Sequence, residues 1–90
     1  MRWKGHRGMT ALSEIRAAIA NAPKVRRGWE RAVLCGFSAW QAVNAEMRFD
    51  QNKDDVPLID GVYVTGTSEF HGWALREIGP NGVWLDVAHG

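Results

Sequence analysis

The chain has 90 residues, of which 46% are hydrophobic, with five Trp, a single Cys and a formal net charge of +1. This length suits one small domain with a thin margin of stability, and one cysteine excludes an internal disulfide framework. The longest largely apolar stretch, residues 32–45, is shorter than the ~20 residues of a membrane-spanning helix. We therefore expect a soluble, cytoplasmic protein that does not bind membranes.

The small net charge conceals a separation of sign along the chain. Residues 1–49 carry nine Lys or Arg and three Asp or Glu, a net of +6, whereas residues 50–90 carry two and seven, a net of −5. The hydrophobic pattern changes at the same point, from helical spacing to the alternation that is typical of strands. The sequence thus predicts two differently built halves with oppositely charged surfaces.

The N-terminal residues divide into an arm and a helix. Residues 1–8 contain two Gly and three basic side chains without periodicity, and we expect a flexible basic arm. Thr10 is placed to cap a helix, and Pro23 ends it, because the residue before a proline is pushed out of the helical region. The apolar stripe of this helix, with the spacing of a buried face, consists of Leu12, Ile15, Ile19 and Ala22.

A second helical region is predicted over residues 24–49. It is either one kinked helix or two helices, at about 25–35 and about 39–49, separated by a tight turn at Gly36. Gly costs about 1 kcal/mol inside a helix, and an S-x-x-Q capping box follows it directly. These two features favour the interpretation with two helices.

The strand pattern begins after a polar connector, residues 50–55. Asp60 and Gly61, between two apolar runs, are a strong hairpin signal because both tolerate the positive φ of a type I′ turn. Residues 79–82 mark another turn, since Pro and Gly occupy the positions that such a turn requires. Alternating segments around these turns predict an antiparallel meander of three or four strands, in which either face could be the inner one.

An antiparallel sheet with one apolar face needs a covering layer, and the upstream helices have matching apolar stripes. The predicted fold is therefore a two-layer α+β domain over residues 9–90. Two or three N-terminal helices, within residues 10–49, pack on one face of a C-terminal antiparallel sheet over residues 56–88.

Motifs for catalysis or metal binding are missing from the sequence. Cys35 and the three histidines, His6, His71 and His89, have spacings that match no zinc pattern, and Cys35 lies in an apolar context that predicts burial. No serine has the surroundings of a nucleophile elbow. We therefore expect no catalytic residues, no metal, no cofactor and no enzymatic activity.

The acidic half predicts a protein–protein interface. Complementary potentials would steer it towards a basic partner, and Trp and Tyr are enriched in interface hot spots. The residues predicted to contact the partner are Asp54, Asp55, Asp60, Tyr63, Glu69, Trp73, Glu77 and Trp84.

The basic half supports an alternative hypothesis, binding of nucleic acid. Cations interleaved with Trp3 and Trp29 have the pattern of a phosphate-backbone footprint with stacking platforms. The predicted contacts are Arg2, Lys4, Arg7, Lys24, Arg26, Arg27 and Arg31. Small and turn residues around Gly36 also match part of a helix-turn-helix, with a downstream hairpin as the wing, but the would-be reading helix, residues 39–46, has no basic residue.

A small, charge-polarised α+β chain without catalytic motifs resembles the proteins that phages encode to disable host machinery, anti-CRISPR proteins among them. The resemblance implies a non-enzymatic inhibitor that binds a larger host protein or nucleoprotein complex. Two alternatives stay open: a nucleic-acid-binding protein, helix-turn-helix or winged-helix-like, and a homo-oligomeric structural component. The sequence does not determine the oligomeric state.

Overall fold

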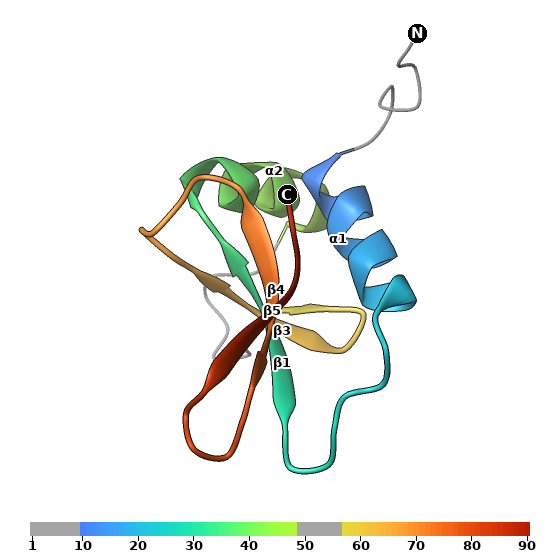
Figure 1. Cartoon of the computed structure of the whole chain (residues 1–90). Coiled ribbons are helices and arrows are strands. Elements are labelled where there is room, and N and C mark those ends of the chain that lie inside the picture. The colour runs from blue at the N-terminus through green and yellow to red at the C-terminus, as the bar shows by residue number, and fades with distance from the viewer. Residues whose placement is uncertain (1–9, 49–56) are drawn as a thin grey trace, which may run out of the picture.

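The computed structural model describes residues 10–48 and 57–90, which form two helices and one five-stranded sheet (Figure 1). The predicted basic arm, residues 1–8, and the polar connector, residues 50–55, lie outside the described residues. The elements in chain order are α1 (Ala11–Asn21), β1 (Glu30–Cys35), α2 (Phe37–Met47), β2 (Leu58–Ile59), β3 (Val62–Gly66), β4 (Trp73–Ile78) and β5 (Trp84–His89). The α+β class is confirmed, but the helices are interleaved with the strands instead of all preceding them.

Helix α1 begins and ends where the sequence predicts. The side chain of Thr10 accepts a hydrogen bond from the Ser13 N–H, and the Ser13 hydroxyl accepts one from the Thr10 N–H, which completes a capping box. The helix stops at Asn21, two residues before Pro23. Local signals were sufficient here because a cap and a proline act on their own neighbours.

The prediction of a helix over residues 25–35 is wrong, because Glu30–Cys35 is strand β1 at the centre of the sheet. Residues Ala32–Cys35 are all buried, and a short apolar run buried on both sides suits a central strand as well as a helix. The break at Gly36 is real, since α2 begins at the next residue. A Cβ atom there would lie 1.9 Å from the carbonyl oxygen of Phe70, so only glycine fits.

The predicted antiparallel meander is also wrong in part. The strand order is β2-β3-β1-β4-β5, and β1 runs parallel to β3 but antiparallel to β4. Insertion of β1 separates β3 from β4 and makes the sheet mixed. The two predicted turns are confirmed: Asp60 and Gly61 have φ of 49° and 83°, and Gly82, with φ of 79°, closes the turn between β4 and β5.

Both helices pack on one face of the sheet, and Figure 1 shows them next to each other at one side of the strands. The buried cluster joins the two helices to the four strands β1 to β4. Its members are Leu12, Ile15, Val33, Cys35, Ala39, Val43, Ile59, Val64, Trp73 and Leu75. On β5 a bulge lies opposite Leu75 and Arg76, and Val87 and Ala88 both pack against this cluster.

Neither helix is long and apolar enough to cross a membrane, as far as the described residues extend.

Candidate functional site

We call the sheet face that points away from the helices the open face. It carries three rows of side chains. Residues paired across strands point to the same side of a sheet, and successive residues alternate. Val33 and Leu75 point to the helices, so their neighbours along β1 and β4 point away. The middle row consists of Leu58, Tyr63, Ala32, Arg76 and Asp86. The outer rows consist of Glu30, Ile78 and Trp84, and of Thr65, Leu34, Ala74 and His89.

Large apolar side chains flank this face and are exposed. The exposed fractions are 51% for Tyr63, 46% for Leu58 and 47% for Trp84. Between them the central strands carry the buried residues Ala32, Leu34 and Ala74. Tyr63 lies on β3 and Trp84 on β5, two strands that are three strand spacings, about 14 Å, apart in the sheet. The open face is therefore a shallow surface with an aromatic residue towards each edge.

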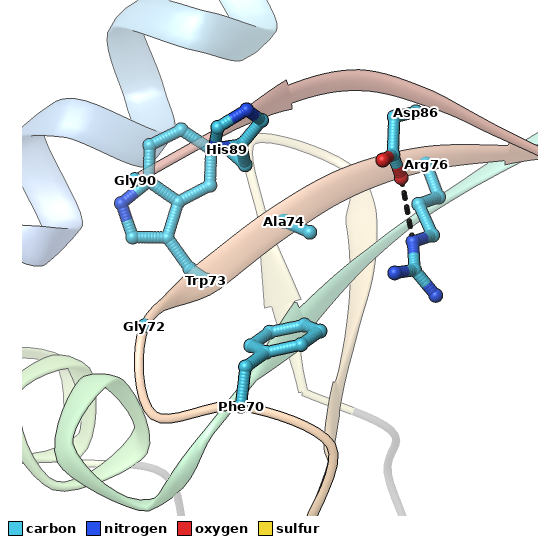
Figure 2. Close-up of a pocket in the computed structure, with 8 residues that line it drawn as sticks. All are labelled: Phe70, Gly72, Trp73, Ala74, Arg76, Asp86, His89 and Gly90. Carbon is cyan, nitrogen blue, oxygen red and sulfur yellow. Dashed lines mark hydrogen bonds and ion pairs between the residues drawn. The ribbon is translucent and has the colours of Figure 1, made fainter.

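A hollow of about 340 Å³ opens at the β4–β5 side of this face, next to the half-buried ring of Phe70 (Figure 2). Arg76 is held there from several directions. Its Nε donates a hydrogen bond of 2.7 Å to Oδ1 of Asp86, one Nη lies 3.8 Å from the carboxylate of Glu69, and its guanidinium lies 5.7 Å from the centre of the Phe70 ring.

The charge that this side of the molecule presents to solvent is mainly negative. The side chain of Arg76 is 21% exposed, whereas those of Asp86 and Glu69 are 60% and 65% exposed. The guanidinium is thus largely engaged inside the protein, while its two carboxylate partners face outward.

No protein-family model, curated protein or solved structure matches this chain. Its function therefore has to be inferred from the geometry and chemistry of its own surfaces. The open face is the strongest candidate, because it combines exposed aromatic rings with outward-facing carboxylates on a hydrogen-bonded sheet.

The predicted partner-binding residues fall into four groups. Tyr63 and Trp84 lie on the open face, and Glu69 lies at its rim. Asp60 occupies the β2–β3 turn, where its carboxylate is 3.7 Å from Arg16 of α1. Trp73 and Glu77 are buried on the helix side of the sheet. Asp54 and Asp55 lie outside the described residues.

Trp73 is part of the core rather than of an exposed surface. Its indole Nε1 donates a hydrogen bond of 3.1 Å to Glu14 on α1, and a Cβ on Gly90 would come within 2.4 Å of this nitrogen. The alternating pattern of residues 70–78 was compatible with either orientation. Packing of α1 against one face decided that Trp73 is buried.

Glu77 is the centre of a partly buried ion-pair network, in which the side chains of Glu77 and Arg31 are 8% and 11% exposed and that of Arg26 is 54% exposed. Its carboxylate accepts hydrogen bonds from Arg31 Nη2 at 2.8 Å and from Arg26 Nη2 at 3.0 Å. These hydrogen bonds, that from Arg31 first, hold the pKa of Glu77 below its ordinary value. Arg31 also donates to the carbonyl of Pro23, and Arg26 lies 4.0 Å from the centre of the Trp29 ring. The network ties the segment between α1 and β1 to β4.

The same network includes two cations predicted to bind nucleic acid, Arg31, which is largely buried, and Arg26, which stays half exposed. Lys24 and Arg27 are exposed, whereas Arg2, Lys4 and Arg7 lie outside the described residues. The first helix of the proposed helix-turn-helix is strand β1, so that motif does not form at Gly36. Helix α2, as predicted, carries no Lys or Arg.

Leu58, Phe70 and Arg76 contribute to the open face but were not among the predicted site residues. Leu58 is paired with Tyr63 on one strand pair, and Arg76 with Asp86 on another. Alternation within each strand was visible in the sequence. The strand order that assembles them into one surface was not.

Groups with potential for nucleophilic or metal chemistry are separated in the structure. Cys35 is buried, and burial raises the pKa of its thiol to about 11, so it is uncharged at neutral pH. Within residues 10–48 and 57–90, no three His, Cys, Asp or Glu side chains gather closely enough to hold a metal ion. His6 is not among these residues.

A third exposed aromatic residue lies away from the open face. Phe37 begins α2 with 67% of its surface exposed, beside an apolar hollow of about 510 Å³ that Trp40 and Cys35 also line. It provides an internal control for experiments on the aromatic residues of the sheet.

Proposed function

We propose that this chain is a non-enzymatic interaction protein whose open face docks onto a larger macromolecular partner and thereby inhibits it. The observation that carries the proposal is the exposure of Tyr63, Leu58 and Trp84 on a sheet face that the helices leave uncovered. Exposed Trp and Tyr side chains are the usual anchors of protein interfaces, and an exposed apolar residue such as Leu58 beside them enlarges the apolar patch.

The open face supports binding because its side chains are ordered before the partner binds. Tyr63 lies in the middle of the sheet's β2-β3-β1 side, with a paired strand on either side of it. Trp84 is paired with Ile78 next to the β4–β5 turn. Pre-ordered anchors lose little conformational entropy on association, so more of the contact energy appears as affinity.

An inhibitory role follows from the size and chemistry of the chain. A protein of 90 residues that blocks a surface needs neither a catalytic group nor a cofactor. The small phage-encoded inhibitors, anti-CRISPR proteins among them, act in this way, and we propose the same mode in the cytoplasm of a host cell.

The decisive experiment compares partner capture by three immobilised proteins from a lysate of the native host. These are the wild type, the double variant Tyr63→Ser/Trp84→Ser, and the control Phe37→Ser, which removes a more exposed aromatic side chain elsewhere. We expect the control to retain the captured partner and each open-face substitution to weaken its affinity by about 30-fold, the value for a hot-spot truncation of about 2 kcal/mol. Equal retention by all three proteins contradicts the proposal.

The two other hypotheses predict different outcomes from the same purified protein. A nucleic-acid-binding protein would shift a DNA duplex at low salt, with an affinity that falls by a log–log slope of about −0.9 for each neutralised phosphate. We expect no such shift, because Arg31 is largely buried against Glu77, which also binds Arg26, and because helix α2 carries no Lys or Arg. A homo-oligomer would gain mass with concentration in light scattering, and we expect a constant mass.

A further inference from the structure

We propose that the partner surface that covers the open face is a cationic, Arg-rich protein surface, and not a second copy of this chain. This inference rests on the proposed docking function and names the chemistry of its partner. It follows from the distribution of charge over the two sides of the sheet.

The open side carries more negative than positive charge. Glu30 and Asp86 lie in its rows, Glu69 lies at its rim, and Arg76 is the only Lys or Arg among the described residues that these rows contain. The guanidinium is mostly covered and faces both Asp86 and Glu69. An approaching molecule therefore meets three carboxylates with one shielded cation beneath them.

The helix side has the opposite balance. Apart from the buried pair Arg31–Glu77, the described part of the helices and their adjoining turns carries five cations and three carboxylates. The cations are Arg16, Lys24, Arg26, Arg27 and Arg48, and the carboxylates are Glu14, Glu46 and Asp60. A cationic partner is thus attracted to one side of the molecule and repelled by the other, which orients its approach.

The aromatic residues make arginine the best-fitting cation. A guanidinium is planar and weakly hydrated, so it stacks on an aromatic ring while pairing with a carboxylate. The chain itself uses this arrangement twice: Arg26 lies over Trp29 and binds Glu77, and Arg76 lies over Phe70 and binds Asp86.

The open face also combines exposed aromatic rings with carboxylates. No Arg of its own three rows stacks on Tyr63 or Trp84 among the contacts of the described residues. Trp84 shares a row with Glu30, two strand spacings or about 10 Å away. Tyr63 is paired with Ala32 on the same strand as Glu30. Arginine side chains from a partner can therefore stack on either exposed ring and reach a carboxylate.

A second copy fits this surface poorly. A two-fold symmetric dimer places the same patch on both sides of the interface, so the exposed carboxylates of one open face would meet those of the other. Like charges brought together in an interface are unfavourable. The aromatic residues alone would allow self-association, but the carboxylates around them oppose it.

The test is a titration of the isotope-labelled full chain with the peptide acetyl-(Arg-Gly)4-amide, followed by amide and indole NMR shifts at low ionic strength. We expect saturable shifts on the open face, including the indole N–H of Trp84, which weaken as salt is added. The matching peptides with Lys and with Glu in place of Arg should bind more weakly and not at all, respectively.

Two double variants with the same change in net charge distinguish an effect of the open-face carboxylates from an effect of the protein's overall charge. Glu30→Gln/Glu69→Gln removes two carboxylates from the open side, and Glu14→Gln/Glu46→Gln removes two from the helix side, where the new amide oxygen at position 14 can still accept the hydrogen bond from Trp73. We expect the first variant to lower the affinity for the Arg peptide about fivefold, which corresponds to the loss of two exposed ion pairs. We expect the second variant to leave this affinity unchanged. Equal losses in both variants, or shifts spread over both sides of the molecule, overturn the proposal.

Failure of this inference is distinguishable from failure of the docking function. If the captured partner depends on Tyr63 and Trp84 but not on Glu30 and Glu69, docking stands and the cationic partner is wrong. If light scattering shows a dimer that Tyr63→Ser/Trp84→Ser dissociates, the second copy is the occupant and the inference is overturned.

Discussion

The two faces of the sheet use similar side chains for different purposes. On the covered face, Arg26 and Arg31 enclose Glu77, whose side chain is 8% exposed, and Arg26 lies against Trp29. On the open face, Arg76 binds Asp86 and Glu69 and lies against Phe70, but these carboxylates remain more than half exposed. The buried carboxylate of Glu77 makes its contacts with Arg26 and Arg31 part of the folded structure. The exposed carboxylates of Asp86 and Glu69 remain accessible to a partner.

Residue type alone therefore does not identify a binding surface in this chain. Trp73 and Trp84 are both strand tryptophans, yet one packs under α1 and the other faces solvent. Their positions relative to the helix layer account for the difference.

The largest expected difference between the faces is in stability. Leu75→Ala empties a fully buried position on the covered face and should lower the free energy of unfolding by about 2–5 kcal/mol. Leu58→Ala on the open face should change it by less than about 0.5 kcal/mol. Urea unfolding of both variants measures the contrast, and similar losses would show that the open face is part of the core.

A smaller effect is expected from the pH dependence of Glu77. Its pKa in the folded protein is lower than the ordinary value of 4.5, so its contribution to stability is complete above that value and is lost as the pH falls through the lowered pKa. Unfolding followed from pH 6 to pH 2 should therefore show a steeper loss of stability for the wild type than for Glu77→Gln.

Arg26→Ala sharpens this test, because it removes one of the two hydrogen-bond donors that lower the pKa of Glu77. The decrease of the free energy of unfolding between pH 6 and pH 2 should be less steep in Arg26→Ala than in the wild type, but steeper than in Glu77→Gln. Identical pH profiles for all three proteins would mean that the network does not stabilise the folded state.

A small effect is also expected for the corresponding ion pair on the open face. Asp86→Asn weakens the contact with Arg76, and because Asp86 is 60% exposed we expect the free energy of unfolding to change by less than about 1 kcal/mol. Thermal unfolding at two salt concentrations measures it. A loss as large as that of Leu75→Ala would place this pair among the structural contacts and remove it from the proposed interface.

Local features of the fold were predictable from the sequence, and so was part of the candidate site. The cap at Thr10, the break at Gly36 and the hairpin at Asp60 each depend on residues within a few positions of one another. Tyr63, Glu69 and Trp84 were recognised as potential contacts because of their residue types. Arg26 and Arg31 were assigned to nucleic acid because Glu77, their partner, is more than 40 positions away in the chain.

Composition and local pattern were enough to predict the α+β class, the first helix, the turns and the excess of charge of opposite sign in each half. Contacts between distant segments were needed to make residues 30–35 the central strand, and to place both helices on one face of the sheet and leave the other open. The reason is physical: caps and turns are satisfied by neighbouring residues, whereas an apolar run becomes a strand or a helix, and an aromatic side chain becomes core or surface, only through contacts with distant segments.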